Sequence, residues 1–276
     1  MKLGDTNVGD LVYLRVSGSY TAFRVMHHGR PDSTYDDSFQ NGTVLMMDYS
    51  QGVYQTLMVE EVDQRKGDYA GSYMHQALNS TWLARLDGSL ASQVVQVKLP
   101  YRQGTDSDPY VVASGSNGLA AKIWLPSIAE VARKTMNDLG TGNFYITEGA
   151  KFDYFKDASA SFYNKWKVLD PDTETDAGWG TRTPGNYGSG EYADFFCKIS
   201  VAGECYTAGK NKVYVRPCLV LPDDTLLDGD GRVTTGVIVP VKVDGVWCSS
   251  VSWCKQAGVW RETASIHKKV DGSWNQ

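Results

Sequence analysis

WGTRTPGNYGSGEYADFFCKISVAGECYTAGKNKVYVRPCLVLP, residues 179–222, is the segment from which the fold is best inferred. It closes with apolar residues at alternate positions, Val213 and Val215 before Pro217 and Leu219 and Leu221 after it. This alternation predicts a buried strand that crosses the core and is broken once at the proline. The run before that strand mixes Tyr and Phe with Ser, Gly, Asp and Asn, which is typical of a recognition surface. An ordinary Gly-rich meander of short strands is the alternative.

Composition limits the class of protein. A chain of 276 residues fits one large domain, or one domain with an appendage, and 42% hydrophobic residues are enough for a core. The 28 glycines favour short strands and tight turns over long helices. A net charge of −5 with a pI near 5.4, and the lack of a Lys/Arg cluster interleaved with aromatics, argue against nucleic acid as a partner. The N-terminus lacks the apolar core of a signal peptide, and no run approaches a membrane span, so we expect synthesis in a cytoplasm and no membrane insertion.

The residue pattern predicts neither a metal, nor a cofactor, nor an enzyme. The four histidines are not spaced for zinc ligation, and the five cysteines include no Cys-x-x-Cys. We expect buried or free thiols, with a disulfide between Cys197 and Cys205 left open. The Asp-Gly-Asp-Gly string at 228–231 lacks the distal Glu of a calcium loop and reads as a turn. No phosphate-binding loop and no nucleophile elbow is present, and nothing in the sequence places a His beside a Cys nucleophile.

Local patterns predict several elements of an α+β, β-rich fold. Residues 11–16 and 21–28 form a strand pair, 43–48 and 123–125 are further strands, and 72–87 is helical with an interruption at 79–81. The best-marked helix begins at Ser127, because Ser127 and Glu130 have the spacing of a capping box. Its apolar stripe includes Ile128 and Val131, and Gly140 is expected to end it.

Three similar units follow residue 236. Each has an Asp-Gly or Ala-Gly turn and a Trp two residues later, at Trp247, Trp260 and Trp274, and each predicts a small β-hairpin. Units this short cannot bury a core alone. We therefore expect one main domain over 1–235 and an assembly module over 236–276.

Five motifs carry a resemblance to a known family. They are Lys-Leu-Gly-Asp at 2–5, Val-Lys-Leu-Pro-Tyr-Arg at 97–102, Gly-Leu-Ala-Ala-Lys-Ile-Trp-Leu at 118–125, Trp-Gly-Thr-Arg-Thr-Pro at 179–184 and Val-Arg-Pro-Cys-Leu-Val-Leu-Pro at 215–222. In this order they resemble an uncharacterised domain family of gut Firmicutes and their phages. The order is also similar to the C-type-lectin-like fold of phage tropism determinants and of the variable proteins of diversity-generating retroelements.

The resemblance implies two roles for the residues within 179–222, a scaffold and a ligand-contacting segment. A scaffold would hold the segment, with its arginines hydrogen-bonded in the core: Trp179, Arg182, Pro184, Arg216 and Pro217. Residues 186–211 would display the ligand-contacting side chains: Tyr187, Ser189, Tyr192, Asp194, Phe195, Ser200, Glu204, Tyr206, Thr207 and Asn211.

The C-terminal units resemble the repeats at the ends of many phage tail and baseplate proteins. The two resemblances together imply a virion protein, made in the bacterial host cytoplasm, of a tail tip or fibre that binds a host cell-surface protein or glycan. Other virion proteins would bind through 236–276, and the chain would form a homo-oligomer. The alternatives are a structural virion protein, such as a capsid decoration or tail adaptor without a specific ligand, and a hydrolase or modifying enzyme on a lectin-like scaffold.

Overall fold

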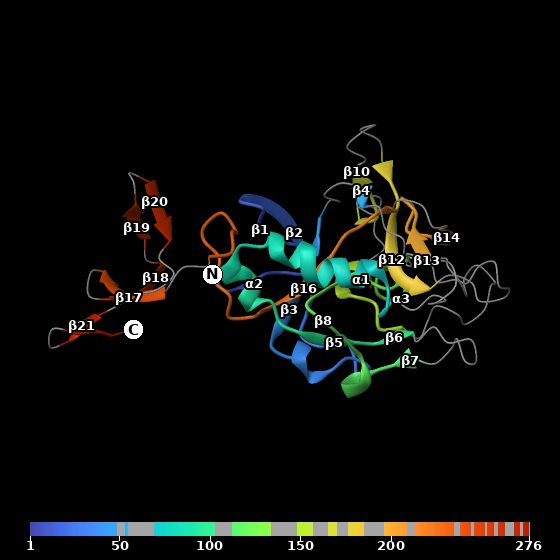
Figure 1. The fold of residues 1–276 in the computed structure, drawn as a ribbon, viewed down its shortest axis with the longest axis horizontal. Helices are drawn as coiled ribbons and strands as arrows, with labels where there is room; N and C mark the ends of the chain where they lie inside the picture. Colours follow the sequence, from blue (N-terminus) through green and yellow to red (C-terminus); the bar gives the residue numbers. More distant parts are fainter. Residues whose placement is uncertain are drawn as a thin grey trace.

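The fold is mixed α+β, as expected. The computed structural model describes residues 1–48, 53–54, 69–102, 112–133, 148–156, 165–169, 176–184, 196–208 and 213–234, and the backbone of six strands between 238 and 275. Figure 1 shows the arrangement of these elements. Within the described residues, no helix combines the length and the apolar character needed to cross a membrane.

A five-stranded sheet in the order β1-β2-β3-β16-β9 forms the centre of the domain. Its strands are β1 (Leu11–Val16), β2 (Ser19–His28), β3 (Gly42–Met47), β16 (Cys218–Pro222) and β9 (Ile123–Trp124), all antiparallel to their neighbours. The predicted strand pair is confirmed, although β2 begins at Ser19 rather than at residue 21. Ser17 and Gly18 have φ values of 49° and 82°, so the two strands are joined by a tight two-residue turn.

The second five-stranded sheet has the order β14-β13-β12-β15-β4. It contains β12 (Trp179–Pro184), β13 (Phe196–Ile199), β14 (Cys205–Ala208), β15 (Val213–Tyr214) and β4 (Val53–Tyr54). The pair β12–β15 is parallel, and the other pairs are antiparallel.

The strand predicted across Pro217 is indeed broken, but its two parts belong to different sheets. The part before the break, β15, pairs with β12, and the part after it, β16, pairs with β3. Proline has no N–H for a ladder, and the Pro217 carbonyl instead accepts from the Met47 N–H at 3.0 Å. The broken strand therefore connects the two sheets.

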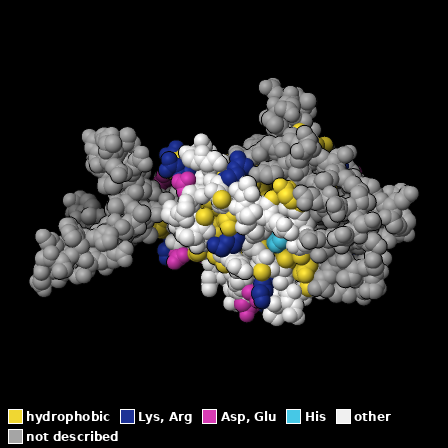
Figure 2. Space-filling model, in the orientation of Figure 1, with side chains coloured by type: hydrophobic (Ala, Val, Ile, Leu, Met, Phe, Trp, Pro, Cys, Tyr) yellow, Lys and Arg dark blue, Asp and Glu magenta, His cyan; other side chains and the backbone are white. Residues whose placement is uncertain are grey.

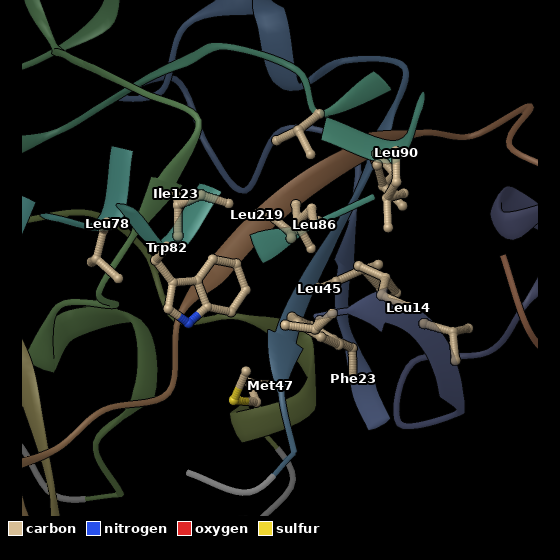
Figure 3. Close-up of a cluster of buried hydrophobic side chains, with 14 of the residues drawn as sticks. Leu14, Phe23, Leu45, Met47, Leu78, Trp82, Leu86, Leu90, Ile123 and Leu219 are labelled. Carbon is tan, nitrogen blue, oxygen red and sulfur yellow. The ribbon is translucent and has the colours of Figure 1, made fainter. Parts of the chain in front are cut away.

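Both faces of the first sheet are buried. Leu45 and Leu219 contribute to one apolar cluster, and their neighbours Val44 and Val220 contribute to the other. Figure 3 shows the first cluster, where Trp82 and other helical residues pack on the sheet. Alternating side chains of a strand point to opposite faces, which explains why a near-continuous apolar run such as β3 belongs in the middle of the domain.

The helical segment predicted over 72–87 is interrupted at the expected place. It consists of α1 (Tyr73–Ala77), a π-helical turn η3 (Leu78–Trp82) and a 3₁₀ turn η4 (Leu83–Arg85), followed by α2 (Gly88–Gln93). The Asn79 side chain at the π turn donates to the Ile123 carbonyl at 2.8 Å and accepts from the Lys122 N–H at 2.8 Å. The irregular turn therefore binds the edge of β9.

His75 makes the stability of this segment dependent on pH. Burial lowers the pKa of His75 from 6.5 to about 4, and the Asn79 amide lies 3.4 Å from His75 Nδ1. The folded state therefore favours the neutral ring. The domain keeps the full contribution of His75 to its stability above pH 6.5, and it loses this contribution between pH 6.5 and 4, where the unfolded chain binds a proton at His75 but the folded chain does not. We expect a loss of about 1–3 kcal/mol over this range. Urea unfolding at stepped pH tests this, and the loss should shrink in His75→Gln; equal pH profiles for both proteins would contradict it.

The predicted helix at Ser127 is correctly started but is much shorter than expected. In α3 (Ile128–Val131) the capping box is present, with Ser127 Oγ accepting from the Glu130 N–H and Glu130 Oε2 accepting from the Ser127 N–H. The helix ends at Val131, because the Val131 carbonyl accepts from Trp166 Nε1 at 2.7 Å and Ala132 is extended. The expectation of a helix reaching Gly140 is therefore wrong in length, and residues 134–147 lie outside the described part.

Shorter elements surround the two sheets. The small antiparallel pairs are β5 (Val97–Leu99) with β8 (Leu119–Ala121), β6 (Tyr101–Arg102) with β7 (Val112–Ala113), and β10 (Val168–Leu169) with β11 (Asp176–Ala177). The remaining short helices are η1 (Leu3–Asp5), η2 (Asp37–Phe39), η5 (Gly115–Asn117) and α4 (Asp153–Lys156).

The two ends of the 1–235 region pair with each other. The Leu3 N–H donates to the Thr225 carbonyl and the Leu227 N–H donates to the Met1 carbonyl, each at 2.8 Å. On the face in Figure 2, Lys and Arg side chains of the described residues are scattered rather than gathered into a basic patch.

The three predicted C-terminal hairpins are present. They are β17 (Ile238–Val243) with β18 (Val246–Val251), β19 (Trp253–Gln256) with β20 (Val259–Glu262), and β21 (Lys268–Val270) with β22 (Ser273–Asn275). Each forms its own two-stranded sheet.

Candidate recognition face and the ion network beneath it

Arg182, one of the predicted scaffold residues, lies fully buried in the middle of β12. Its guanidinium donates from Nη1 to Glu130 Oε2 at 2.7 Å and from Nη2 to Glu130 Oε1 at 2.8 Å. Such a bidentate ion pair combines opposite charges with two parallel hydrogen bonds of fixed geometry. The same two nitrogens donate to the carbonyls of Leu125 and Pro100, each at 3.0 Å. One side chain therefore holds β12, α3 and the chain before β6 together.

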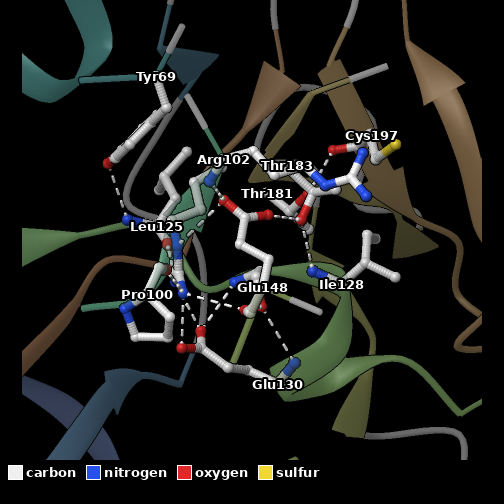
Figure 4. A network of polar contacts seen from close by, with 12 residues as sticks. Tyr69, Pro100, Arg102, Leu125, Ile128, Glu130, Glu148, Thr181, Thr183 and Cys197 are labelled. Carbon is white, nitrogen blue, oxygen red and sulfur yellow. Dashed lines mark hydrogen bonds and ion pairs between the residues drawn. The ribbon is translucent and has the colours of Figure 1, made fainter. Parts of the chain in front are cut away.

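A second buried carboxylate, Glu148, completes the network in Figure 4. Glu148 Oε2 accepts from Thr183 Oγ1 at 2.7 Å, and Glu148 Oε1 accepts from the Arg102 N–H at 3.2 Å. The Glu148 carbonyl accepts from Ser127 Oγ at 2.7 Å. Glu148 therefore connects β12, β6 and the start of α3.

The electrostatics of the network favour permanent charge on Arg182. Burial alone acts to lower the pKa of Arg182, but Glu130, followed by Glu148, raises it above the ordinary value. Burial raises the pKa of Glu148, and Arg182 and the Thr183 hydroxyl oppose that rise. Tyr35 donates to Glu130 Oε1 at 2.6 Å, and burial, with Glu130, raises the tyrosine pKa well above 10.0. Since the donors and acceptors face one another inside the core, we interpret the network as a structural clamp on β12.

Arg216, the other predicted scaffold arginine, is buried between the two sheets. Its Nε donates to the Met47 carbonyl at 2.8 Å and its Nη1 to the Lys165 carbonyl at 2.7 Å. Its guanidinium lies over the Trp179 ring, 5.4 Å from the ring centre. Burial lowers the pKa of Arg216 to about 10, with Asp48 opposing the shift. Trp179 itself is buried and donates from Nε1 to the Trp166 carbonyl at 2.9 Å.

The predicted display segment begins and returns at one end of the second sheet. There Pro184 of β12 is opposite Phe196 of β13, and Phe196 is opposite Ala208 of β14. The chain between Pro184 and Phe196 lies outside the described residues, as does the chain that follows Ala208. Six of the predicted contact residues fall in these two stretches: Tyr187, Ser189, Tyr192, Asp194, Phe195 and Asn211. The backbone of Tyr206 and Thr207 lies in β14, opposite Lys198 and Cys197.

Ser200 and Glu204 lie at the opposite end of the β13–β14 hairpin. Ser200 Oγ accepts from the Glu204 N–H at 3.1 Å, and the Ser200 N–H donates to the Glu204 carbonyl at 2.8 Å. The Glu204 carboxylate pairs with Arg133 at 3.2 Å. These contacts shape the turn, and the structure does not bring these two residues to the end formed by Pro184, Phe196 and Ala208.

Gly203 in this turn packs directly on the core. Its φ is +75°, and an added Cβ would lie 2.6 Å from the Trp166 ring. We expect Gly203→Ala to destabilise the domain by about 1–3 kcal/mol, through overpacking and backbone strain. Chemical denaturation measures this, with Gly229→Ala as the control because a Cβ there meets nothing within 4 Å. Equal effects of the two substitutions would show that the close approach to Trp166 is not important.

Sequence reasoning missed the partners of Arg182. The capping-box pattern predicts Glu130 only as a helix cap, and no pattern in the sequence points to Tyr35 or Glu148. Tyr35 and Glu148 are far from Arg182 in the chain, and neither belongs to any of the motifs quoted above. The available signal was the charged Glu130 in an otherwise apolar run, since a buried carboxylate needs a cationic partner.

The described cysteines are buried and form no disulfide: Cys197, Cys205 and Cys218. The disulfide left open between Cys197 and Cys205 is not formed, since Cys197 is opposite Thr207 and Cys205 is opposite Ile199. In the part of the chain that the structure describes, no group of three or more His, Cys, Asp or Glu side chains could hold a metal ion.

A family model described as "Domain of unknown function (DUF6273)" matches residues 40–223, more than half of the chain. The match includes both five-stranded sheets apart from β1 and β2, and it includes Arg182, Glu130, Glu148 and Arg216. No curated protein and no solved structure matches the chain.

Proposed function

We propose that this chain, which belongs to the DUF6273 domain family, is a phage virion protein of the tail tip or fibre that binds a host cell-surface protein or glycan. The binding face is the end of the second sheet where Pro184, Phe196 and Ala208 are side by side. The observation that supports this proposal is that these three positions lie together at the end of β12, the strand that Arg182 and Thr183 hold in place.

The clamp gives this face a rigid base. Arg182 and Thr183, adjacent to Pro184 in β12, are both buried and bound to Glu130 and Glu148. On the neighbouring strand, Phe196 and Cys197 are also buried. A rigid base reduces the conformational entropy that a binding surface loses when it binds a ligand.

The residues attached to this base have the composition of a paratope. Residues 185–195 contain two Tyr and one Phe among Gly, Ser, Asn and Asp. Aromatic side chains supply contact area at low entropic cost, and the small polar residues supply adaptable hydrogen bonds. We assign the domain a C-type-lectin-like fold and a non-enzymatic role, in keeping with the resemblance of its motifs.

Avidity is the proposed binding mechanism. Weak contacts made by one copy are multiplied when many copies on one particle engage the same cell surface. The virion location follows from the resemblance of both the domain motifs and the C-terminal repeats to phage proteins.

Binding of the purified full chain to intact candidate host cells tests the proposal. The key variant replaces Tyr187, Tyr192, Phe195 and Tyr206 with Ala, and we expect it to lose binding while its thermal unfolding is unchanged. A matched control replaces Tyr20 and Tyr73, which are 46% and 48% exposed elsewhere on the domain, and should bind as wild type does. If the folded protein binds no strain saturably, the alternative of a structural virion protein is favoured.

A further inference from the structure

The three C-terminal hairpins share one register. In each hairpin two residues, the second of them Gly, separate the two strands in the sequence. The second residue pair counted from that point joins a Lys and a Trp: Lys242 with Trp247, Lys255 with Trp260, and Lys269 with Trp274. The repeat is therefore one structural unit used three times.

Within the described residues, each of these six strands is paired along one edge. An isolated two-stranded hairpin is at best marginally stable in water, and three or more strands are needed for independent stability. An unpaired strand edge presents a row of N–H and C=O groups that another strand can bind. A further strand paired along one of these edges would therefore add stability to a hairpin.

The first hairpin cannot obtain that strand from the second one directly. Only one residue separates the end of β18 at Val251 from the start of β19 at Trp253. A chain reversal between antiparallel strands commonly needs at least two residues. β19 therefore cannot turn back to pair along the full outer edge of β18.

The two outer edges of the first hairpin differ. In a hairpin with a two-residue turn, the pair next to the turn, here Val243 with Val246, is hydrogen-bonded, and bonded and non-bonded pairs then alternate. Pro240 and Ser249 therefore form a non-bonded pair, at which backbone N–H groups point outward. Proline has no N–H, so the outer edge of β17 is interrupted, whereas β18 keeps the Ser249 donor.

We propose that the outer edge of β18 pairs with β18 of a second copy of this chain. Identical edges related by a two-fold axis pair antiparallel and form a self-complementary interface. The resulting four-stranded sheet meets the minimum for stability. By strand alternation, Val241, Val243, Val246 and Cys248 are at positions on one face of the hairpin. This interface also links recognition domains in pairs, which supports avidity.

Sedimentation of the full chain at micromolar concentrations, without any ligand, tests this assignment. We expect twice the monomer mass of 30.4 kDa, and Ser249→Pro, which removes the outward donor without removing a bond inside the hairpin, should give the monomer. Ser249→Lys should also give the monomer, because a lysine on an edge strand opposes edge-to-edge pairing. Ser249→Ala keeps the backbone donor and should remain dimeric.

A wild-type monomer, or variants Ser249→Pro and Ser249→Lys that assemble as wild type does, would overturn the inference. The recognition proposal is judged separately, since cell binding by a monomer would still reveal the face at Pro184, Phe196 and Ala208.

Discussion

Arg182→Met is expected to destabilise the domain by about 3–5 kcal/mol, because it leaves the carboxylate of Glu130 buried without its cationic partner. The side chains of Arg182 and Glu130 are both 0% exposed, and two charge-assisted hydrogen bonds join them. The substitution also removes the donors to the carbonyls of Leu125 and Pro100, which remain in the core. The free energy of unfolding from urea titration measures the loss.

Two comparisons separate the buried pair from a general effect of losing an arginine. Arg133→Met removes a pair with Glu204 whose side chains are 28% and 40% exposed, and should cost at most about 1 kcal/mol. The double variant Arg182→Met with Glu130→Gln should recover part of the stability, because it removes the orphaned charge. If Arg182→Met loses no more than Arg133→Met, the clamp is not a major source of stability.

Trp179→Ala is expected to cost about 3–5 kcal/mol, the range for deleting a large aromatic from a core. Trp179 is 0% exposed, its ring lies under the Arg216 guanidinium, and its Nε1 donates to the Trp166 carbonyl. Its removal therefore opens a cavity where β12, β15 and the crossing at Pro217 meet. Thermal and urea unfolding should both report the loss.

Trp179→Phe distinguishes packing from hydrogen bonding at the same position. It keeps an aromatic ring but leaves the Trp166 carbonyl without its donor, so a loss of about 1–3 kcal/mol is expected. Tyr73→Ala, at an aromatic side chain that is 48% exposed, should change stability by about 0.5 kcal/mol or less. Near-equal stability of Trp179→Ala and wild type would show that this tryptophan does not anchor the second sheet.

Several elements could be predicted because their determinants are neighbours in the chain. Alternating apolar residues define the β1–β2 pair, and Ser127 with Glu130 defines the start of α3. The repeated Asp-Gly or Ala-Gly dipeptide with a Trp two residues later defines the three C-terminal hairpins. Pro217 marks a break because the missing N–H is a covalent property of the residue. In each case the signal and its consequence lie within a few residues of each other.

The length of α3, the division of the broken strand between two sheets and the partners of Arg182 depend on residues that are distant in sequence. α3 ends at Val131 because the indole N–H of Trp166, 35 residues away, donates to the Val131 carbonyl. Glu130 meets Arg182 across 52 residues, and Tyr35 meets Glu130 across 95. Local patterns determined which segments are strands, turns and helix starts, since backbone conformation responds to adjacent residues. The tertiary structure alone decided which buried charges pair, because that choice depends on which segments pack together in the core.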